Sequence, residues 1–510
     1  MRWISLAQRP LRRKASRKLR VLSPLLLTSA LALISPQSAA ADQPPVLDAR
    51  ALGERVRVMV EEANLSPRIG LSIVDLATGQ PVVAINDKLA LNPASNLKLL
   101  TAAAALQQLG ADFRMHTGLY GKVHNGRIAG DLCLKGQADP TLTRADLAGF
   151  AQRLRDEGVR EVERLVIDAS YFDSAILPPA FEQQPRESAP FRAAIGAVSI
   201  NANAYSIRVR PGDKLGASAL VSVDAAGYFE IDNRVITARE PMPTVQIVER
   251  DLGDRVALTL TGKVPLEAAN LTWTRRVSSP LSFAGHLFSE VLTNAGVRAP
   301  KSVQAGTCAQ DAPLIAMHDS VPLAQLLARL GKDSDNFAAE MVVKILGAER
   351  KQKPATTADG VVVVQETLRG LGLPTDGATL VNGSGLFQGN LVTTQLVSQL
   401  LATMYRNQAL RPEFVSHLAV GGVDGTLTKR FADLAARRVV RAKTGTLADV
   451  IALSGYVLSA KPERAYAFSY LANGITGKQA QARELIDKVV SLLASQLFSA
   501  PAKTPVAASH

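Results

Sequence analysis

Three short motifs lie far apart along this chain, and the spacing of the first two limits what the chain can fold into. The motifs are Ser95-Asn96-Leu97-Lys98, Ser334-Asp335-Asn336 and Lys443-Thr444-Gly445. The step from Ser95 to Ser334 covers 239 residues, whereas structureless loops beyond about 12–15 residues are uncommon in compact domains. We therefore expect this stretch to fold separately, as an insertion into the domain that carries the motifs.

The first motif combines a hydroxyl with an amine at the start of a helix. Ser95 precedes an apolar run at residues 97–106, which predicts a buried helix. At positions i and i+3, the Cβ atoms of Ser95 and Lys98 lie about 5–6 Å apart, so the amine can take the hydroxyl proton. A lysine with a pKa of about 10.4 is a poor base at neutral pH. We expect burial and the charge of Lys443 to lower that pKa.

Each motif alone has an ordinary structural explanation. S-x-x-K arises by chance about once in a chain of this length, and alone it indicates a helix cap followed by a solvated lysine. Ser334-Asp335-Asn336 alone indicates the N-cap of a helix at residues 337–343. Lys443-Thr444-Gly445 alone indicates a strand that enters a turn. Together and in this order, the three motifs predict an acyl-transfer site.

Further segments extend the similarity over nearly the whole chain beyond the N-terminal region. Together with the three motifs, they resemble the class C low-molecular-mass penicillin-binding proteins. These are D-alanyl-D-alanine carboxypeptidases and endopeptidases of peptidase family S13. The segments are residues 139–142, 382–386, 423–427, 443–447 and 452–456.

The resemblance implies an α+β fold. Its transpeptidase/β-lactamase-like catalytic domain, an antiparallel sheet flanked by helices, is interrupted by an inserted domain with a smaller nested β domain. We expect the catalytic domain at residues 48–115 and 310–498, the insert at 116–309 and the nested β domain at about 213–264. Residues 70–75 and 81–86 predict a hairpin before Ser95. His124-Asn125-Gly126 predicts a turn between two strands within residues 115–134.

The family mechanism implies a catalytic role for five residues. Ser95 is the expected nucleophile and Lys98 the base in acylation. Ser334 is expected to pass a proton between Lys98 and the leaving amine. Asn336 is expected to hold the substrate backbone amide, and Lys443 to supply positive charge near the site.

The third motif is also expected to bind the substrate, through Thr444, Gly445 and Thr446. In the family mechanism the two threonines bind the terminal carboxylate, and the backbone N–H groups of Ser95 and Thr446 form the oxyanion hole. The implied partners are peptidoglycan stem peptides, with β-lactam antibiotics as inhibitors. We expect no cofactor and no metal, because the six histidines form no metal-binding motif. Nothing in the sequence resembles a nucleic-acid-binding module.

Two alternative functions remain open on the same scaffold. A β-lactamase or esterase would need fast deacylation. A non-catalytic β-lactam sensor or wall-binding protein usually continues from a membrane helix into a signalling domain, and this chain shows neither. Two departures from the family leave substrate detail open: residues 182–191 lack a Trp-rich pattern, and Leu386-Phe387-Gln388 replaces the common Ser-Arg. The carboxypeptidase-to-endopeptidase balance and the oligomeric state are not assigned.

Residues 1–41 predict a Sec-type signal peptide and export to the periplasm. A basic region, an apolar core at residues 21–34 and Ala39-Ala40-Ala41 follow in the expected order. The core is shorter than the about 20 apolar residues of a membrane span, and a retained anchor is the alternative. Residues 1–41 hold eight Lys/Arg and no Asp/Glu, so only +5 of the net charge of +13 remains beyond them. This favours at most peripheral membrane association. Residues 499–510 predict a loose tail.

Two cysteines, Cys133 and Cys308, bracket the expected insert. Segments that leave and re-enter a host domain lie close together, so the pair can reach the about 4.4–6.8 Å Cα separation of a disulfide. One disulfide in an oxidising compartment and two buried thiols fit the sequence equally well.

Overall fold

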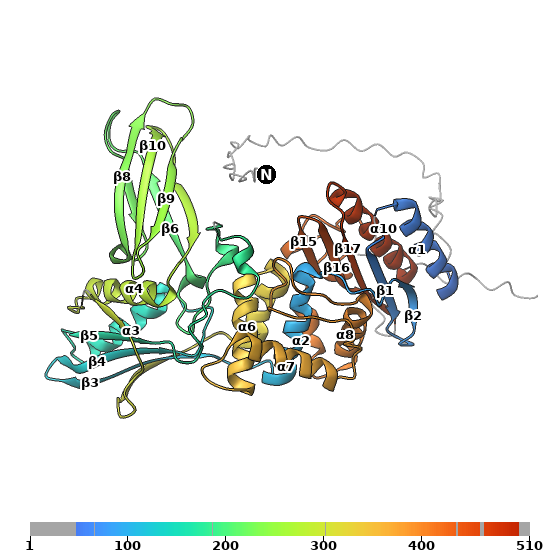
Figure 1. The fold of residues 1–510 in the computed structure, drawn as a ribbon, viewed down its shortest axis with the longest axis horizontal. Helices are drawn as coiled ribbons and strands as arrows, with labels where there is room; N and C mark the ends of the chain where they lie inside the picture. Colours follow the sequence, from blue (N-terminus) through green and yellow to red (C-terminus); the bar gives the residue numbers. More distant parts are fainter. Residues whose placement is uncertain are drawn as a thin grey trace, which may run out of the picture. The chain divides into compact units, whose positions relative to one another are not determined.

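The computed structural model describes residues 47–498, except Ser66, Arg186, Lys301 and residues 435–436 and 460–463. The expected signal peptide at residues 1–41 and the expected tail at residues 499–510 lie outside the described residues. The described chain has the expected α+β fold, in which several sheets are interleaved with helices (Figure 1).

Six antiparallel strands form the sheet that carries the third motif. In spatial order they are β14 (Ala419–Val420), β15 (Val440–Leu447), β16 (Val450–Leu458), β17 (Ala465–Asn473), β1 (Ile69–Asp75) and β2 (Pro81–Ile85). The hairpin expected before Ser95 is confirmed by the pairing of β1 with β2. Lys443 lies on β15, which pairs with β16.

Helices cover both faces of this sheet. Successive side chains of a strand point to opposite faces, so the residues of one strand show which helices lie on each side. On β17, Phe468 and Tyr470 pack in the core that includes α1 (Ala49–Ala63) and α10 (Gln479–Phe498). The alternate residues, Ala467 and Leu471, belong to the core that includes α2 (Leu97–Leu109). That second core also takes in α5 (Leu323–Ala328), α6 (Asn336–Arg350), α7 (Thr357–Gly370), α8 (Thr394–Arg406) and α9 (Arg411–Ser416).

The inserted region is built around a second sheet (Figure 1). Its five strands, in spatial order, are β12 (Val303–Ala305), β5 (Arg164–Asp168), β4 (Arg127–Gly136), β3 (His116–His124) and β13 (Leu314–Asp319). Its core includes α3 (Arg144–Asp156) and α4 (Pro280–Asn294). Asn125 and Gly126 turn the chain between β3 and β4 with φ angles of 48° and 76°, which confirms the predicted turn. β13 lies beyond residue 309, and the domain boundaries stay a prediction.

Two small sheets lie in the middle of the insert, and their strands run from residue 204 to residue 276, beyond the range of about 213–264 expected for the nested β domain. One contains β8 (Phe229–Ala238), β10 (Val256–Pro265) and β9 (Gln246–Asp251); the other contains β11 (Leu271–Arg276), β6 (Ala204–Arg210) and β7 (Leu220–Val223). Their buried side chains belong to the same hydrophobic core as the five-stranded sheet. Among the described helices of the chain, none combines the length and apolar character needed to cross a membrane.

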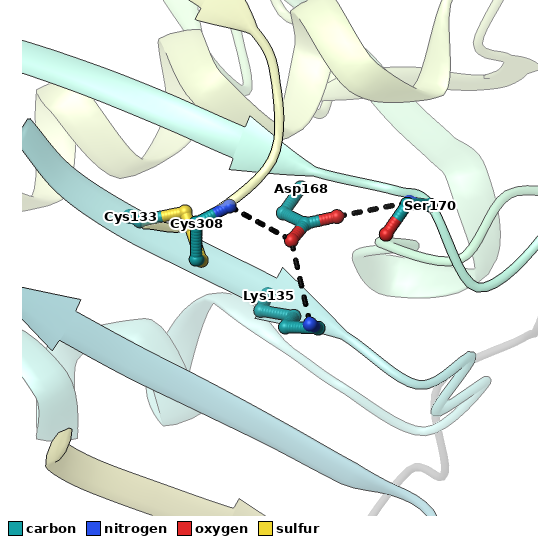
Figure 2. Close-up of a disulfide and its surroundings, with 5 residues drawn as sticks. All are labelled: Cys133, Lys135, Asp168, Ser170 and Cys308. Carbon is teal, nitrogen blue, oxygen red and sulfur yellow. Dashed lines mark hydrogen bonds and ion pairs between the residues drawn. A yellow bond between two sulfur atoms is a disulfide. The ribbon is translucent and has the colours of Figure 1, made fainter. Parts of the chain in front are cut away.

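A disulfide joins Cys133 on β4 to Cys308, with 5.5 Å between the Cα atoms (Figure 2). Of the two alternatives that the sequence leaves open, a disulfide and two buried thiols, the structure has the disulfide. The buried Asp168 lies beside it and accepts hydrogen bonds from the backbone N–H groups of Cys308 and Ser170, both at 3.0 Å. The Lys135 ammonium lies 3.6 Å from the Asp168 carboxylate. The bridge and this carboxylate therefore fix the returning chain to the sheet.

Candidate active site

Ser95 lies in a short 3₁₀ turn, Ala94–Asn96, that leads directly into α2. The turn is anchored to the sheet because the buried Asn96 donates to Ser454 Oγ at 2.8 Å. Lys98, on the first turn of α2, donates from Nζ to Ser95 Oγ at 3.0 Å. The predicted helix and the predicted pairing of the two side chains are both present.

The Lys98 amine is buried and held in three directions. Besides Ser95 Oγ, its Nζ donates to Asn336 Oδ1 at 2.7 Å and to the Ser384 carbonyl at 2.8 Å. Burial lowers the pKa of Lys98 from 10.5 to about 7, against the opposing charges of Glu340 and Asp335. An amine with this pKa exists partly in the neutral form near pH 7 and can accept a proton.

The second motif spans a turn and the start of α6. Ser334 follows a π-helical turn, Arg329–Asp333, and adopts left-handed backbone angles of φ 60° and ψ 34°. This conformation costs about 1–3 kcal/mol for a residue with a side chain, and such residues cluster at functional sites. Asp335 is the N-cap of α6 and accepts from the Ala338 N–H at 3.1 Å. Asn336 therefore enters the site from the first turn of α6.

Lys443 approaches the same site from β15. Its Nζ donates to Ser334 Oγ at 2.9 Å and to the Thr444 carbonyl at 2.8 Å. Burial and the nearby charge of Lys98 lower the pKa of Lys443 well below its usual value. Lys98 Nζ thus contacts Ser95 and Asn336. Lys443 Nζ contacts Ser334.

Two glycines allow the segments of the site to approach closely. A Cβ at Gly445 would lie 3.0 Å from the Pro93 carbonyl oxygen, next to the turn that carries Ser95. A Cβ at Gly385 would lie 1.9 Å from the Ala94 carbonyl oxygen, and φ at this position is 74°. Neither position accommodates a side chain without movement of the Ser95 turn.

Thr444 and Thr446 lie two residues apart on β15 and so on the same face of the strand. Thr446 is exposed, whereas Thr444 is partly buried and its Oγ1 lies 2.8 Å from Thr426 Oγ1. Sequence reasoning gave Thr426, Ser384 and Glu340 no role. The signal for two of them was present, because residues 382–386 and 423–427 are among the segments that carry the family resemblance.

The amino-acid sequence matches known enzymes across most of its length. The profile of the D-Ala-D-Ala carboxypeptidase 3 (S13) family matches residues 52–496. The chain belongs to the S13 family of D-Ala-D-Ala carboxypeptidases. This S13 carboxypeptidase is 37% identical over 445 residues to the D-alanyl-D-alanine carboxypeptidase of Actinomadura sp. (strain R39), a match that covers 84% of this chain and 81% of the relative. It is 25% identical over 420 residues to the carboxypeptidase DacB of Haemophilus influenzae, with 80% and 85% covered.

Solved structures show the same fold. The crystal structure of penicillin binding protein 4 from Haemophilus influenzae superposes with a TM-score of 0.72 at 24% identity, covering 87% of this chain and 99% of that one. A second structure of that protein, in complex with a β-lactam, superposes with a TM-score of 0.68 at 23% identity, covering 88% and 100%. The α+β fold expected from the sequence and the resemblance to family S13 are confirmed.

The two departures from the family pattern contact each other beside the site of this S13 carboxypeptidase. The Phe387 ring packs on the Phe181 ring of the insert with 5.7 Å between centroids. Gln388 and Gln183 exchange hydrogen bonds of 3.1 and 3.3 Å between side chain and backbone. The exposed Phe191 accepts at its carbonyl from Asn336 Nδ2 at 3.1 Å. The insert therefore reaches the second motif.

Proposed function

We propose that this S13 carboxypeptidase hydrolyses the D-alanyl-D-alanine ends and the DD-cross-links of peptidoglycan stem peptides through an acyl-enzyme on Ser95. One observation carries the proposal: each motif hydroxyl lies beside a buried lysine. Lys98 Nζ is 3.0 Å from Ser95 Oγ, and Lys443 Nζ is 2.9 Å from Ser334 Oγ. A nucleophile beside a base of lowered pKa is the arrangement that acyl transfer needs.

In the first half of the proposed reaction, Ser95 Oγ attacks the carbonyl carbon of the penultimate D-alanine and its proton passes to the neutral Lys98 amine. The C–N bond then breaks, and the leaving amine takes a proton relayed from Lys98 through Ser334. The hydrogen bond from Lys443 Nζ to Ser334 Oγ supports this relay, because it leaves the Ser334 proton free to point into the site.

In the second half, water takes the place of the leaving amine and gives its proton to Lys98 as it attacks the ester. The ester C–O bond then breaks, Lys98 returns this proton to Ser95 Oγ, and the shortened stem leaves as a carboxylic acid. Backbone N–H groups of Ser95 and Thr446 form the proposed oxyanion hole, where loss of one donor typically costs about 10²–10³ in turnover. Thr444 and Thr446, on one face of β15, are the proposed hydrogen-bond donors to the terminal carboxylate, beside the close-packed Gly445.

β-Lactams are the proposed covalent inhibitors. A β-lactam presents an amide carbonyl to Ser95 in a strained ring, and its amine stays attached to the acyl group after the ring opens, so it obstructs the incoming water. The Haemophilus influenzae protein of the same fold has been solved in complex with a β-lactam, which supports extension of this chemistry to the present chain.

We also propose export to the periplasm, after removal of about the first 41 residues. The disulfide between Cys133 and Cys308 supports an oxidising compartment. N-terminal sequencing of protein from the cell envelope is expected to begin near Asp42. Protein that begins at Met1 and needs detergent for release contradicts this proposal.

The decisive experiment incubates the pure protein with cross-linked and uncross-linked muropeptides and identifies the products by mass spectrometry. Loss of one D-alanine from pentapeptides indicates carboxypeptidase activity, and conversion of dimers to monomers indicates endopeptidase activity. Ser95→Ala is the control and is expected to form neither product. The proposal fails if wild-type protein leaves both substrates intact, or if Ser95→Ala processes them equally well.

A further inference from the structure

Helix α6 places a second acidic group behind the active site. Glu340 lies one helical turn after Asn336, so the two residues share a face of α6. Its side chain is fully buried, with 0% exposure. One carboxylate oxygen accepts from the Gly383 N–H at 3.0 Å and the other from the Ser384 N–H at 2.8 Å. Glu340 therefore binds two consecutive backbone amides.

The segment that Glu340 binds is itself in contact with the Lys98 amine. The Ser384 carbonyl accepts from Lys98 Nζ at 2.8 Å, and the Gly383 carbonyl accepts from Thr101 Oγ1 at 2.8 Å. The Gly383-Ser384 segment is thus held on its N–H side by α6 and on its carbonyl side by α2. Any shift of this segment would move the Ser384 carbonyl, which together with Asn336 Oδ1 holds the Lys98 amine beside Ser95 Oγ.

We propose that Glu340 is a positioning residue for acylation, whose carboxylate fixes the Ser384 carbonyl on Lys98 and supplies the negative charge that acts on this amine. The inference rests on the proposed role of Lys98 as the base toward Ser95. It adds a residue outside the three motifs to the acylation machinery.

The charges around Lys98 support an electrostatic part in this role. Glu340 and Asp335 both raise the pKa of Lys98, against the larger effect of burial. Asp335 is also paired with Arg329, 3.0 Å away. Burial raises the pKa of Glu340, and the hydrogen bonds from Ser384 and Gly383 and the charge of Lys98 act against this rise and favour the carboxylate. On the other side, Lys443 is close enough that the charge of Lys98 lowers its pKa.

Further titratable groups on the Lys443 side of the site are His417, Lys332 and Asp424. The buried His417 has its pKa lowered to about 4 by burial, with further lowering by the charges of Lys443 and Lys332. Lys332 in turn pairs with Asp424 at 2.7 Å. Glu340 is fully buried and its charge acts on Lys98. Removal of this charge is therefore expected to change the pKa of Lys98.

The test compares three variants by the rate at which benzylpenicillin acylates the full-length protein between pH 5.5 and 9. Glu340→Gln removes the charge and places an amide NH₂ against a backbone N–H. We expect its plateau rate to fall roughly 10–10²-fold. We expect its acid limb to move down by about one pH unit, because loss of an opposite charge lowers the pKa of Lys98.

Glu340→Asp keeps the charge and shortens the side chain. It is expected to lower the plateau rate and leave the acid limb at the wild-type pH. Glu349→Gln is the matched control on the same helix, where the carboxylate accepts from the Tyr171 hydroxyl at 2.7 Å. It is expected to change neither the plateau nor the limb. Circular dichroism checks that each variant is folded.

Three outcomes overturn the inference. They are a wild-type plateau in Glu340→Gln, a slowed reaction whose acid limb stays in place, and an equal effect of Glu349→Gln. If Glu340→Gln does not fold, a wild-type plateau in Glu340→Asp overturns it instead. Failure of the wild-type protein to form an adduct at Ser95 contradicts the proposed function and is thereby distinguished from failure of this inference.

Discussion

Two buried polar clusters in this carboxypeptidase, one at the three motifs and one beside the disulfide, have opposite effects on the charged forms of their side chains. At the motifs, Lys98 and Lys443 are both enclosed, and burial lowers the pKa of each. Beside the disulfide, burial acts to raise the pKa of Asp168, but hydrogen bonds from Ser170 and Cys308 and the charge of Lys135 outweigh it, so the pKa is lowered. The first cluster disfavours its charged forms, and the second stabilises its charged form.

This difference separates the proposed active site from a structural cluster. A group whose charged form is disfavoured releases or takes up protons near neutral pH and can carry out acid–base chemistry. A carboxylate with its charge satisfied on both oxygens contributes to stability instead. We therefore expect changes in the first cluster to alter acylation more than stability, and changes in the second to alter stability alone.

The largest expected effect is loss of the base. Lys98→Ala should slow acylation by benzylpenicillin roughly 10²–10⁴-fold. Lys98→Arg should not restore the rate, because guanidinium stays protonated. Stopped-flow acylation and intact-mass analysis measure both variants, and thermal unfolding is expected to change little. A Lys98→Arg variant that acylates at the wild-type rate contradicts the assignment.

The disulfide should matter for stability alone. Replacing both Cys133 and Cys308 with serine should lower the free energy of unfolding by at most about 5 kcal/mol in the chain-entropy model. The acylation rate of the folded variant should stay within about twofold of wild type, since the bridge lies outside the three motifs. Urea unfolding measures the first quantity. Thiol counting on denatured, unreduced wild-type protein should find none, and two reactive thiols would contradict the bridge.

Asp168→Asn tests the stabilising cluster directly. The amide keeps one acceptor but turns an NH₂ toward a backbone N–H, which should cost about 1–3 kcal/mol of stability. Lys135→Gln is the comparison, because Lys135 is 41% exposed and such pairs contribute about 0–1 kcal/mol. Equal destabilisation by the two variants, or a slowed acylation in Asp168→Asn, would remove the contrast between the clusters.

The smallest expected effect is the pH dependence that distinguishes the clusters. With the pKa of Lys98 at about 7, the acylation rate should rise tenfold per unit below that pH and level off above it. Between about pH 7 and 10.5 the unfolded chain binds the additional proton, so the Lys98 contribution to stability rises with pH. The Asp168 contribution is instead present above its usual pKa of 3.8 and lost at lower pH. Urea unfolding across pH measures both.

Local patterns predicted the elements that carry the motifs. The apolar run after Ser95 and the turn at Asn125-Gly126 depend on neighbours in sequence, and both are present. The contact of Lys98 with the Ser384 carbonyl was not predictable, because a backbone carbonyl has no side-chain signal. The left-handed backbone of Ser334 likewise depends on the surrounding fold.

Pairing between distant segments was also beyond local patterns. Residues 204–210 and 271–276 form strands outside the range expected for the nested β domain, and they pair with each other. The parallel pairing of β8 with β10 requires a crossover that composition does not reveal. Cys133 and Cys308 are brought together by strands β4 and β5 and by the returning chain.

The bridge between Cys133 and Cys308 also determines how the molecule would respond to mechanical force. It closes a sequence separation of 175 residues into a covalent ring. A pull applied to the two ends of the chain therefore passes through the sulfur atoms and bypasses the ring. The contour length inside the ring, about 600 Å at roughly 3.3–3.6 Å per residue, stays hidden until a reductant opens it. Under tension the chain outside the ring, which includes the six-stranded sheet and strands β3 and β13, would bear the load, while residues 134–307 would carry no tension.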